Sequence, residues 1–358
     1  MRRPGQSTVG GDKVARVRAT IVKVLVTGGT GFIGSHLVSA LGRRGQDVRC
    51  LVRSRSSVDR LRSNGVELAW GDVADESSVA RAVADVDVVY HLAGAIKALR
   101  ASDYLRVNET GTRNVARACA ARTSPPALVL LSSLSAAGPA PAGRLRTEAD
   151  APAPVSNYGR SKRLGEVAAE QVARDVPLTI LRPPIVFGEE DREMLNMVQP
   201  IVASGLHVVP TLATRRFSLV YAGDLADVLI EAADRGARVR PGDGNVPGTG
   251  SGYYFPAYDE HPTYAGLGRL IGQAVGREHV RVLHAPAPLT WLFAATVQIV
   301  SQVRRRPSVI SLDKVRESNA GDWTCSPSKT REEIGFSPLP LSDRLRTTTD
   351  WYRRQGWL

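Results

Sequence analysis

The feature that most constrains this chain is a glycine-rich turn near its amino end. Residues 23–34 read Lys-Val-Leu-Val-Thr-Gly-Gly-Thr-Gly-Phe-Ile-Gly, a short apolar run followed at once by closely spaced glycines. Glycine lets the backbone approach a pyrophosphate and lets the next helix pack tightly on the strand. The first turn of that helix adds free amide donors and a positive dipole end. The segment predicts a dinucleotide-binding turn made by Gly28, Thr30, Gly31, Phe32, Ile33 and Gly34.

Short apolar runs alternate with amphipathic stretches over the first half of the chain. Strands are predicted at 22–27, 48–52, 66–69, 86–91, 127–132 and 178–181, and helices at 32–44, 56–63, 76–84, 101–121 and 157–174. This order is typical of a parallel sheet covered by helices on both faces. After Pro183 the pattern loosens, with helices expected at 222–234, 264–275 and 285–303. We therefore predict an α/β fold, a Rossmann-type doubly wound parallel sheet over residues 21–185 with a smaller carboxy-terminal substrate-binding lobe over 186–358.

Composition limits the partners that we expect. Residues 1–20 are basic without a continuous apolar run, which predicts a disordered extension and no export signal. The net charge is +12, but the arginines are scattered, often beside acids, so no nucleic-acid partner is expected. The three cysteines and six histidines lack disulfide or metal spacing, which predicts no metal site and fits a reducing cytoplasm.

One apolar stretch, at 285–303, is interrupted by threonine, serine and glutamine. These interruptions argue against a transmembrane span. A core or lid helix and a helix that contacts a membrane surface peripherally both remain open.

The end of the second predicted strand bears on the choice of cofactor. NAD sites place an acid there to bind the ribose hydroxyls, whereas this chain has Val52 followed by Arg53 and Arg55. Because a guanidinium suits a 2′-phosphate, NADP is favoured over NAD, although these arginines could also be ordinary solvated charges. Asp72, after the third strand, is expected either to reach the adenine or to serve as a turn aspartate.

A candidate proton-transfer pair follows the fifth strand. Tyr158 and Lys162 are four residues apart, so on a helix they share one face. A nearby ammonium is expected to lower the pKa of the tyrosine towards neutral pH, as acid–base catalysis requires. The strand itself ends in serines that could polarise a substrate oxygen, and Asn108 could hold a water against Lys162.

These segments resemble the extended short-chain dehydrogenase/reductases, the epimerase/dehydratase-like group, over about residues 21–350. The resemblance rests on the glycine turn, His91 to Gly94, Asn108 with Gly111, Ser132-Ser133, Tyr158 with Lys162, and Leu181-Arg182-Pro183. It implies that Ser133 is the catalytic serine, with Ser135 as an outside candidate, that Tyr158 donates or accepts the proton, and that Asn108 completes the relay. It also implies that Lys162 binds the nicotinamide ribose, that Leu92, Ala93, Gly94 and Pro183 contact the cofactor, and that the predicted helices at 101–121 and 157–174 form a symmetric homodimer.

Two positions bear on the substrate. Members that act on nucleotide-linked sugars usually carry asparagine where this chain has Ile185, and often arginine where it has Phe217, although Arg215 and Arg216 are adjacent. The segments around these positions resemble the 3-beta-hydroxysteroid dehydrogenase and dihydroflavonol reductase branches. The leading prediction is an NAD(P)-dependent oxidoreductase for a secondary alcohol or ketone of a bulky small molecule. A nucleotide-sugar epimerase or dehydratase with tightly held NAD, and a non-catalytic dinucleotide-sensing scaffold, are the alternatives.

Overall fold

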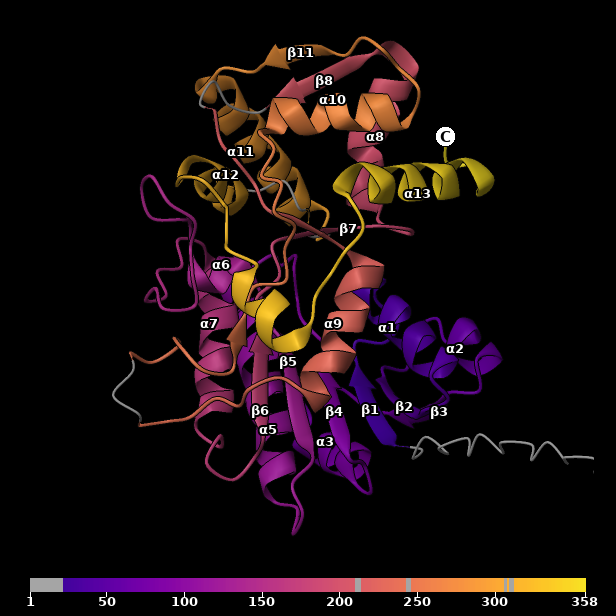
Figure 1. Ribbon diagram of the computed structural model, residues 1–358, viewed down its shortest axis with the longest axis vertical. Helices are drawn as coiled ribbons and strands as arrows, with labels where there is room; N and C mark the ends of the chain where they lie inside the picture. Colours follow the sequence, from indigo (N-terminus) through magenta and orange to yellow (C-terminus); the bar gives the residue numbers. More distant parts are fainter. Residues whose placement is uncertain (1–21, 210–213, 243–245, 306–307, 309–311) are drawn as a thin grey trace, which may run out of the picture.

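A seven-stranded parallel sheet forms the lower half of the molecule in Figure 1, a computed structural model that describes residues 22–209, 214–242, 246–305, 308 and 312–358. The strands lie in the order β10-β6-β5-β4-β1-β2-β3. They are β1 Lys23–Thr27, β2 Asp47–Val52, β3 Glu67–Trp70, β4 Val88–His91, β5 Ala127–Leu131, β6 Leu178–Leu181 and β10 Tyr253–Tyr254. The predicted doubly wound sheet is confirmed. Its order reverses between β1 and β4, where such sheets open a crevice at the carboxyl ends of the strands.

Helices cover both faces of this sheet. They are α1 Phe32–Arg43, α2 Asp59–Ser63, α3 Glu76–Val83, α5 Thr112–Ala120, α7 Asn157–Glu170 and α9 Ala222–Asp234. Successive side chains of a strand point to opposite faces, so Val24 and Val26 pack with α1 and α9, while Leu25 packs with α3 and α5. Burial on both faces explains why the strands are almost continuously apolar.

A second group of elements lies above the carboxyl ends of the strands (Figure 1). It contains α8 Arg192–Ser204, β8 Leu206–Val209, α10 Tyr264–Ala274, β11 Arg281–His284, α11 Ala287–Val303, α12 Leu312–Asn319 and α13 Leu341–Arg354. α8, α10 and α13 share an apolar core that includes Val198, Ile271 and Tyr352. Below it, β7 Ile185–Phe187 pairs with β9 Leu219–Tyr221.

The chain returns to the sheet after residue 185. β10 pairs with β6, and α9 packs on α1 in the same core. The division into domains at 185/186 stays a prediction, since elements from its carboxyl side complete the nucleotide-binding half. The extension predicted at residues 1–20 lies outside the described residues.

Two local predictions differ from the structure. The helix expected at 101–121 is α4 Ala101–Leu105, then a π-helical segment at Arg106–Gly111, then α5. β7 to β11 were not predicted, because each has only two to four residues and gives no measurable periodicity. They form strands only because they pair with segments that are distant in the sequence.

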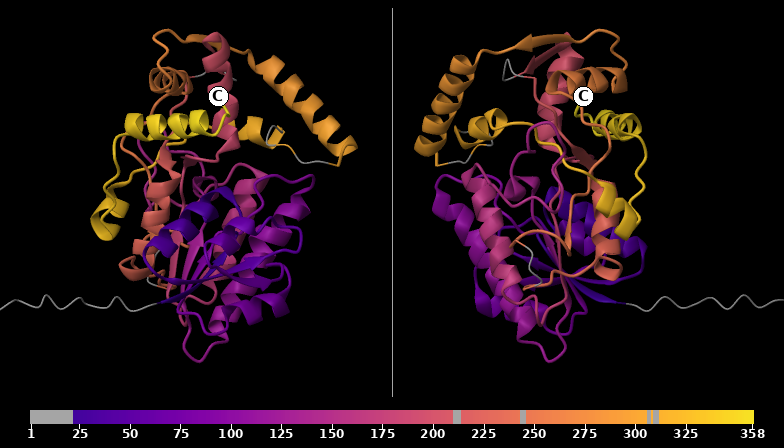
Figure 2. Two further views of the ribbon diagram at one scale, coloured as in Figure 1. Left: turned by 90° about the vertical axis from the view of Figure 1, so that its right-hand side faces the viewer. Right: turned by 60° about the vertical axis from the view of Figure 1, so that its left-hand side comes forward.

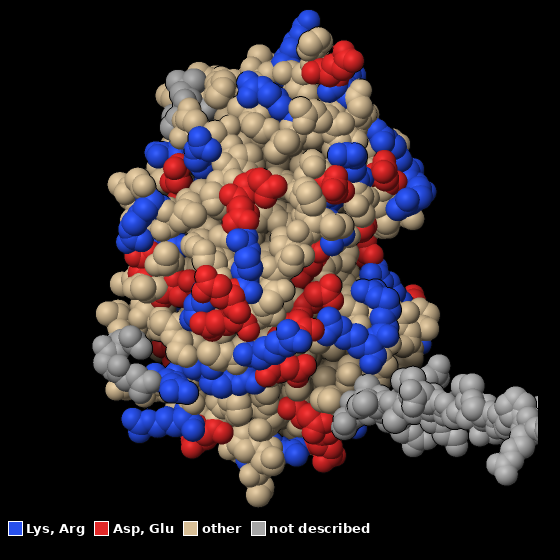
Figure 3. Space-filling model, viewed as in Figure 1, with Lys and Arg blue, Asp and Glu red and all other residues tan. Residues whose placement is uncertain are grey.

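Charges of both signs are mixed over the face shown in Figure 3. Many arginines in the described part of the chain pair with acids, as Arg44 does with Glu231 at 2.8 Å. Within the described part of the chain, no helix is long and apolar enough to cross a membrane. The same residues contain no cluster of three or more His, Cys, Asp or Glu side chains suited to a metal ion.

Candidate active site

The glycine turn after β1 lies against the loop after β4. Gly28 has φ of 77°, and a Cβ there would lie 2.8 Å from the Ala93 amide nitrogen. A Cβ on Gly34, in the first turn of α1, would lie 2.1 Å from the Gly28 carbonyl oxygen. Both distances are too short for any side chain, so only glycine lets strand, turn and helix approach this closely. Gly31 is the N-cap residue of α1, and the first turn carries no acidic side chain that would repel a phosphate.

A pocket of about 760 Å³ opens beside this turn. It brings together Thr30, Arg53 and Asp72, which were predicted from separate segments, with Arg55 and Trp70. Trp70 and the serines at 54, 56 and 57 were missed, because residues at strand ends and in loops carry no periodic signal. Asp72 also accepts a hydrogen bond from the Ala74 amide at 2.9 Å, so it stabilises its own turn as well as facing the pocket.

A buried histidine links the turn to the catalytic side of the crevice. His91 Nδ1 lies 2.7 Å from Thr27 Oγ1, and Nε2 lies 3.0 Å from Thr112 Oγ1. Thr112 donates its hydroxyl hydrogen to the Asn108 carbonyl, so its oxygen accepts from His91, and this places the imidazole hydrogen on Nε2. Burial, with a smaller effect of Lys162, lowers the pKa of His91 to about 3. His91 is therefore a neutral connector between strand and helix.

Asn108 lies in the π-helical segment and is held from two sides. Its Oδ1 accepts from the Ala95 amide at 2.8 Å, and its Nδ2 donates to the Ala95 carbonyl at 3.0 Å and to Ser161 Oγ at 2.8 Å. A Cβ on Gly165 would lie 2.2 Å from the Asn108 carbonyl oxygen, so this glycine lets α7 approach the segment. Asn108 thus joins the loop after β4 to α7. Its part in a proton relay stays a prediction.

Tyr158 lies in the first turn of α7 and close to Ser133. Ser133 caps the short helix α6, Leu134–Ala137, and its Oγ accepts from the Ser135 amide at 3.1 Å. Burial raises the pKa of Tyr158 to about 12, while a hydrogen bond with the Ser133 side chain lowers it. This direction is opposite to the one expected from the sequence. The physical reason is that desolvation of the phenolate outweighs the favourable contacts of Tyr158.

The Lys162 ammonium points to the end of β5. Its Nζ donates to the Leu131 carbonyl at 2.7 Å, and burial lowers the pKa of Lys162 to about 8. A Cβ on Gly94 would lie 3.3 Å from Asn108 Oδ1 and 3.6 Å from Lys162 Nζ. The structure therefore brings together Gly94, Asn108 and Lys162 from three separate elements. The same crevice holds Leu92 beside the turn and Pro183, whose carbonyl accepts from the Leu134 amide at 2.8 Å.

An ion pair beneath the site was missed from the sequence. Arg182 donates to both Glu166 oxygens, from Nε at 2.8 Å and from Nη2 at 2.7 Å, and both side chains are fully buried. Ser132 Oγ donates to the same carboxylate at 2.5 Å. Glu166 lies one turn after Lys162, so this contact fixes the part of α7 that carries the lysine. No local pattern in the sequence joins Glu166 to Arg182, because the two residues lie 16 positions apart.

The two positions that the sequence singled out as bearing on the substrate both carry apolar side chains. Ile185, in β7, is 40% exposed. Phe217 packs in a cluster with Trp323 and Phe255. The arginines next to Phe217 bind backbone carbonyl groups. Arg216, for example, donates to the His261 carbonyl at 3.1 Å.

Comparison with known proteins agrees with this geometry. The model of the NAD dependent epimerase/dehydratase family matches residues 24–246. A ceramide reductase of Caulobacter vibrioides is 32% identical over 94% of this chain and 96% of its own length. The 3 beta-hydroxysteroid dehydrogenase type 7 of Homo sapiens is 29% identical over 91% of this chain and 94% of its own length. A UDP-glucose 4-epimerase structure from Thermotoga maritima has the same fold, with a TM-score of 0.72 at 19% identity, and covers 93% of this chain and 99% of that one.

Proposed function

Since this chain belongs to the NAD dependent epimerase/dehydratase family, we propose that it transfers a hydride between NADP and a secondary alcohol or ketone on a bulky, apolar molecule. The coarser statement is established: the chain is an NAD(P)-dependent oxidoreductase of the epimerase/dehydratase type and resembles the 3-beta-hydroxysteroid dehydrogenase branch. The substrate class and the preferred cofactor are the proposal.

The proposed substrate class rests on the apolar side chains at two positions. Ile185 and Phe217 stand where sugar-nucleotide enzymes usually place polar anchors. A buried polar substrate needs hydrogen-bond partners, whereas an apolar one gains from contact with such side chains. The names of the two relatives point the same way, because ceramides and 3β-hydroxysteroids carry secondary hydroxyl groups on large apolar frameworks.

The residues of the site have separate tasks in this reaction. A bound nicotinamide supplies or accepts the hydride. Tyr158, whose raised pKa keeps it protonated at neutral pH, can donate its hydroxyl proton to the substrate oxygen as a ketone is reduced. Ser133 beside it hydrogen-bonds the same oxygen and stabilises the charge that develops there. Lys162, held at the Leu131 carbonyl, positions the cofactor ribose.

The pocket beside the glycine turn supports NADP. Arg53 and Arg55 line it, whereas the end of β2 offers the buried, uncharged Val52 in place of the acid that would bind a 2′-hydroxyl. The titration of NADP against NAD tests this choice. Replacing Arg53→Ser should lower the NADP:NAD affinity ratio about tenfold or more, the loss expected for a hydrogen bond to a charged group. Arg62→Ser, at the carboxyl end of α2, should leave the ratio unchanged.

Measurements of turnover and of thermal stabilisation test the proposed substrate class. Wild-type protein with NADPH should reduce long-chain or steroidal ketones, and Tyr158→Phe should abolish this turnover while NADP still raises the melting temperature. Stabilisation by UDP- or dTDP-sugars with no response to apolar ketones would replace the proposal by the epimerase alternative. No turnover on either panel, with normal cofactor binding by Tyr158→Phe, would favour the non-catalytic scaffold.

A further inference from the structure

Helix α11 faces its apolar side outward. Figure 2 shows it, in orange, at the periphery of the upper half, and it packs on α12. Leu292 is 66% exposed, Phe293 58% and Val303 79%. A surface helix of a globular protein normally turns such residues inward and its polar ones outward. In α11, by contrast, these three large apolar residues face outward, and the small residue Ala294 is buried.

Most of the exposed apolar residues form a stripe along one side of α11, which Thr296 interrupts, while Trp291 lies off the stripe. Those with large apolar side chains are Leu289, Trp291, Leu292, Phe293, Ile299, Val300 and Val303. Most are spaced three or four apart, which on a helix places them on one face. A contiguous apolar patch of this kind marks an interaction surface.

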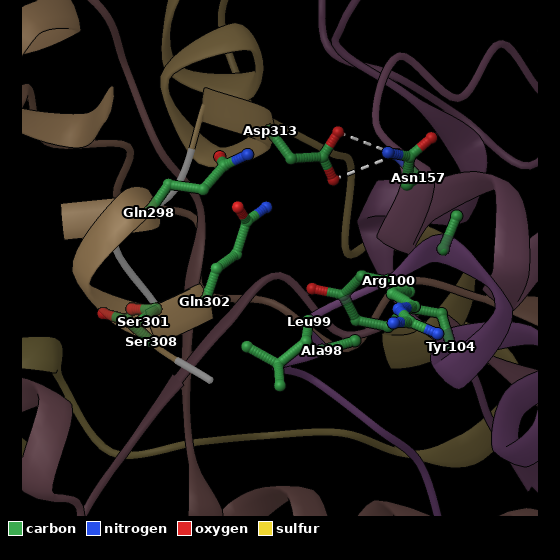
Figure 4. A pocket seen from close by; sticks show the side chains of 11 residues that line it. Ala98, Leu99, Arg100, Tyr104, Asn157, Gln298, Ser301, Gln302, Ser308 and Asp313 are labelled. Atoms are coloured by element: carbon green, nitrogen blue, oxygen red, sulfur yellow. Dashed lines mark hydrogen bonds between the residues drawn. The ribbon is translucent and has the colours of Figure 1, made fainter. Parts of the chain in front are cut away.

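The side of α11 that carries Gln298 and Ser301 faces a small pocket (Figure 4). The pocket has a volume of about 90 Å³ and is lined by Gln298, Ser301 and Gln302 from α11 and by Asp313 from α12. Tyr104 lines its opposite side, and the Tyr104 ring centroid is 6.0 Å from that of Tyr158. The helix therefore separates this pocket, next to the catalytic tyrosine, from the outward apolar stripe.

The charged residues in and around α11 indicate which kind of surface covers the stripe. Residues 279–312 contain four arginines, at 281, 304, 305 and 306, and no aspartate or glutamate. Arg304 and Arg305 are exposed directly at the carboxyl end of α11. A second copy would place like charges against each other, whereas an anionic lipid surface complements them. An apolar stripe flanked by arginines, too short to span a bilayer, is the pattern of a helix that lies in the membrane interface.

We propose that α11 docks the enzyme on a bilayer that contains anionic lipids, with the stripe in the acyl boundary and Arg304 and Arg305 at the phosphates. The pocket under α11 then lies next to the membrane surface, where an apolar substrate dissolves. This second step rests on the proposed function. Docking itself needs neither substrate nor cofactor.

Vesicle flotation with the full chain tests the docking. Wild-type protein should float with phosphatidylcholine vesicles that contain phosphatidylglycerol, and less with phosphatidylcholine alone. Leu292→Gln/Phe293→Gln should lower the bound fraction at least tenfold. Arg304→Gln/Arg305→Gln should lower binding to the anionic vesicles about tenfold or more and should remove most of its salt dependence.

Matched control variants distinguish binding through α11 from nonspecific binding to vesicles. Leu339→Gln changes an exposed leucine away from α11, and Arg353→Gln/Arg354→Gln changes a basic pair at the end of α13. Both should bind vesicles like the wild type. No vesicle binding, equal loss in these controls, or a dimer that Leu292→Gln/Phe293→Gln dissociates would overturn the proposal. An enzyme that binds vesicles but reduces no apolar ketone would overturn the proposed function and leave docking intact.

Discussion

The hydroxyl groups at the end of β5 differ in what they contact. Ser133 hydrogen-bonds Tyr158 and Ser132 hydrogen-bonds Glu166, whereas Ser135 is the second residue of α6. The sequence places all three at the same sheet edge, and only these contacts separate them. Because Ser133 alone of the three contacts Tyr158, it is the serine that we expect to act on the same substrate oxygen.

Alanine variants at these positions should therefore behave differently. Ser133→Ala should lower kcat/KM on the order of 100-fold. Ser135→Ala should stay within about threefold of the wild type, since a hydroxyl off the reacting atoms adds little. Ser132→Ala should retain turnover but lose about 1.5–3 kcal/mol of unfolding free energy, because it removes a hydrogen bond to a buried charge. Steady-state kinetics and urea unfolding measure both effects, and a larger catalytic loss in Ser135→Ala would reassign the serine.

His91 makes the protein sensitive to acid. Its pKa of about 3 in the folded protein lies below the value of about 6.5 expected in the unfolded chain, so the unfolded chain binds more protons below pH 6.5. The stability due to neutral His91 is complete above pH 6.5 and is lost as the pH falls. Between pH 6.5 and 5 the loss should be about 2 kcal/mol. His91→Gln should flatten the curve of unfolding free energy against pH by that amount, whereas His279→Gln, at an exposed site, should not.

At the scale of elements, close packing of α1 on the glycine turn decides whether a nucleotide can bind. Gly34 and Gly42 lie in the same helix, but a Cβ would clash only at Gly34, and nothing lies within 4 Å of one at Gly42.

Alanine substitution should separate packing from helix propensity. Gly34→Ala should weaken cofactor binding at least tenfold and cost about 1–3 kcal/mol, the usual effect of overpacking. Gly42→Ala should leave cofactor binding unchanged and add about 0.5–1 kcal/mol, because alanine is the better helix former. Cofactor titration and thermal unfolding are the measurements. Equal behaviour of the two variants would contradict the packing argument.

A second contact between elements holds the start of α7, the helix that carries Tyr158. Asp313 of α12 accepts from the amides of Asn157 at 2.9 Å and Tyr158 at 3.3 Å, and Glu317 accepts from the cap residue Ser156 at 2.5 Å. These acids lie more than 150 residues away in the chain. Asp313 satisfies amide donors that the first turn of a helix otherwise leaves free, and Glu317 holds the hydroxyl of the cap residue.

Removing this cap should loosen the turn that carries Tyr158. Asp313→Ala should cost about 0.5–2 kcal/mol of stability and lower kcat severalfold, and Asp313→Asn, which keeps an acceptor, should lose less. Asp343→Ala, which removes an exposed acid in the first turn of α13, serves as the control. If both alanine variants reduced kcat equally, the cap would have no special role.

At the scale of the whole molecule, the resemblance to the extended short-chain dehydrogenase/reductases implies a dimer. It would form through α7 and the helices within residues 101–121. Leu164 and Val167 on α7 are 41% and 36% exposed, an apolar patch on a helix whose other side carries the site. Light scattering should give about twice the 38.5 kDa of one chain. Leu164→Glu/Val167→Glu should give the monomer, because each buried leucine or valine contributes about 1.5–3 kcal/mol and charges cannot replace it. Leu292→Gln/Phe293→Gln should remain dimeric, since the two surfaces are separate.

Much of the nucleotide-binding half could be predicted from the sequence, because its signals are local. The strand, turn and helix at 23–43 follow from apolar periodicity and glycine spacing, and the predicted ends differ from the observed ones by at most one residue. The four-residue spacing of Tyr158 and Lys162 likewise placed both on one helix. Family resemblance then supplied their roles.

What only the tertiary structure decided depends on contacts between distant residues. The pairing of Glu166 with Arg182, the cap from Asp313 and the choice among three serines join elements far apart in the chain. The pKa of Tyr158 moved opposite to the sequence expectation, since burial is a property of the folded molecule. For α11, the sequence predicted an apolar helix interrupted by polar residues, but it does not say which side of that helix faces water. Packing on α12 turned its apolar side outward, and this orientation is the basis of the membrane proposal.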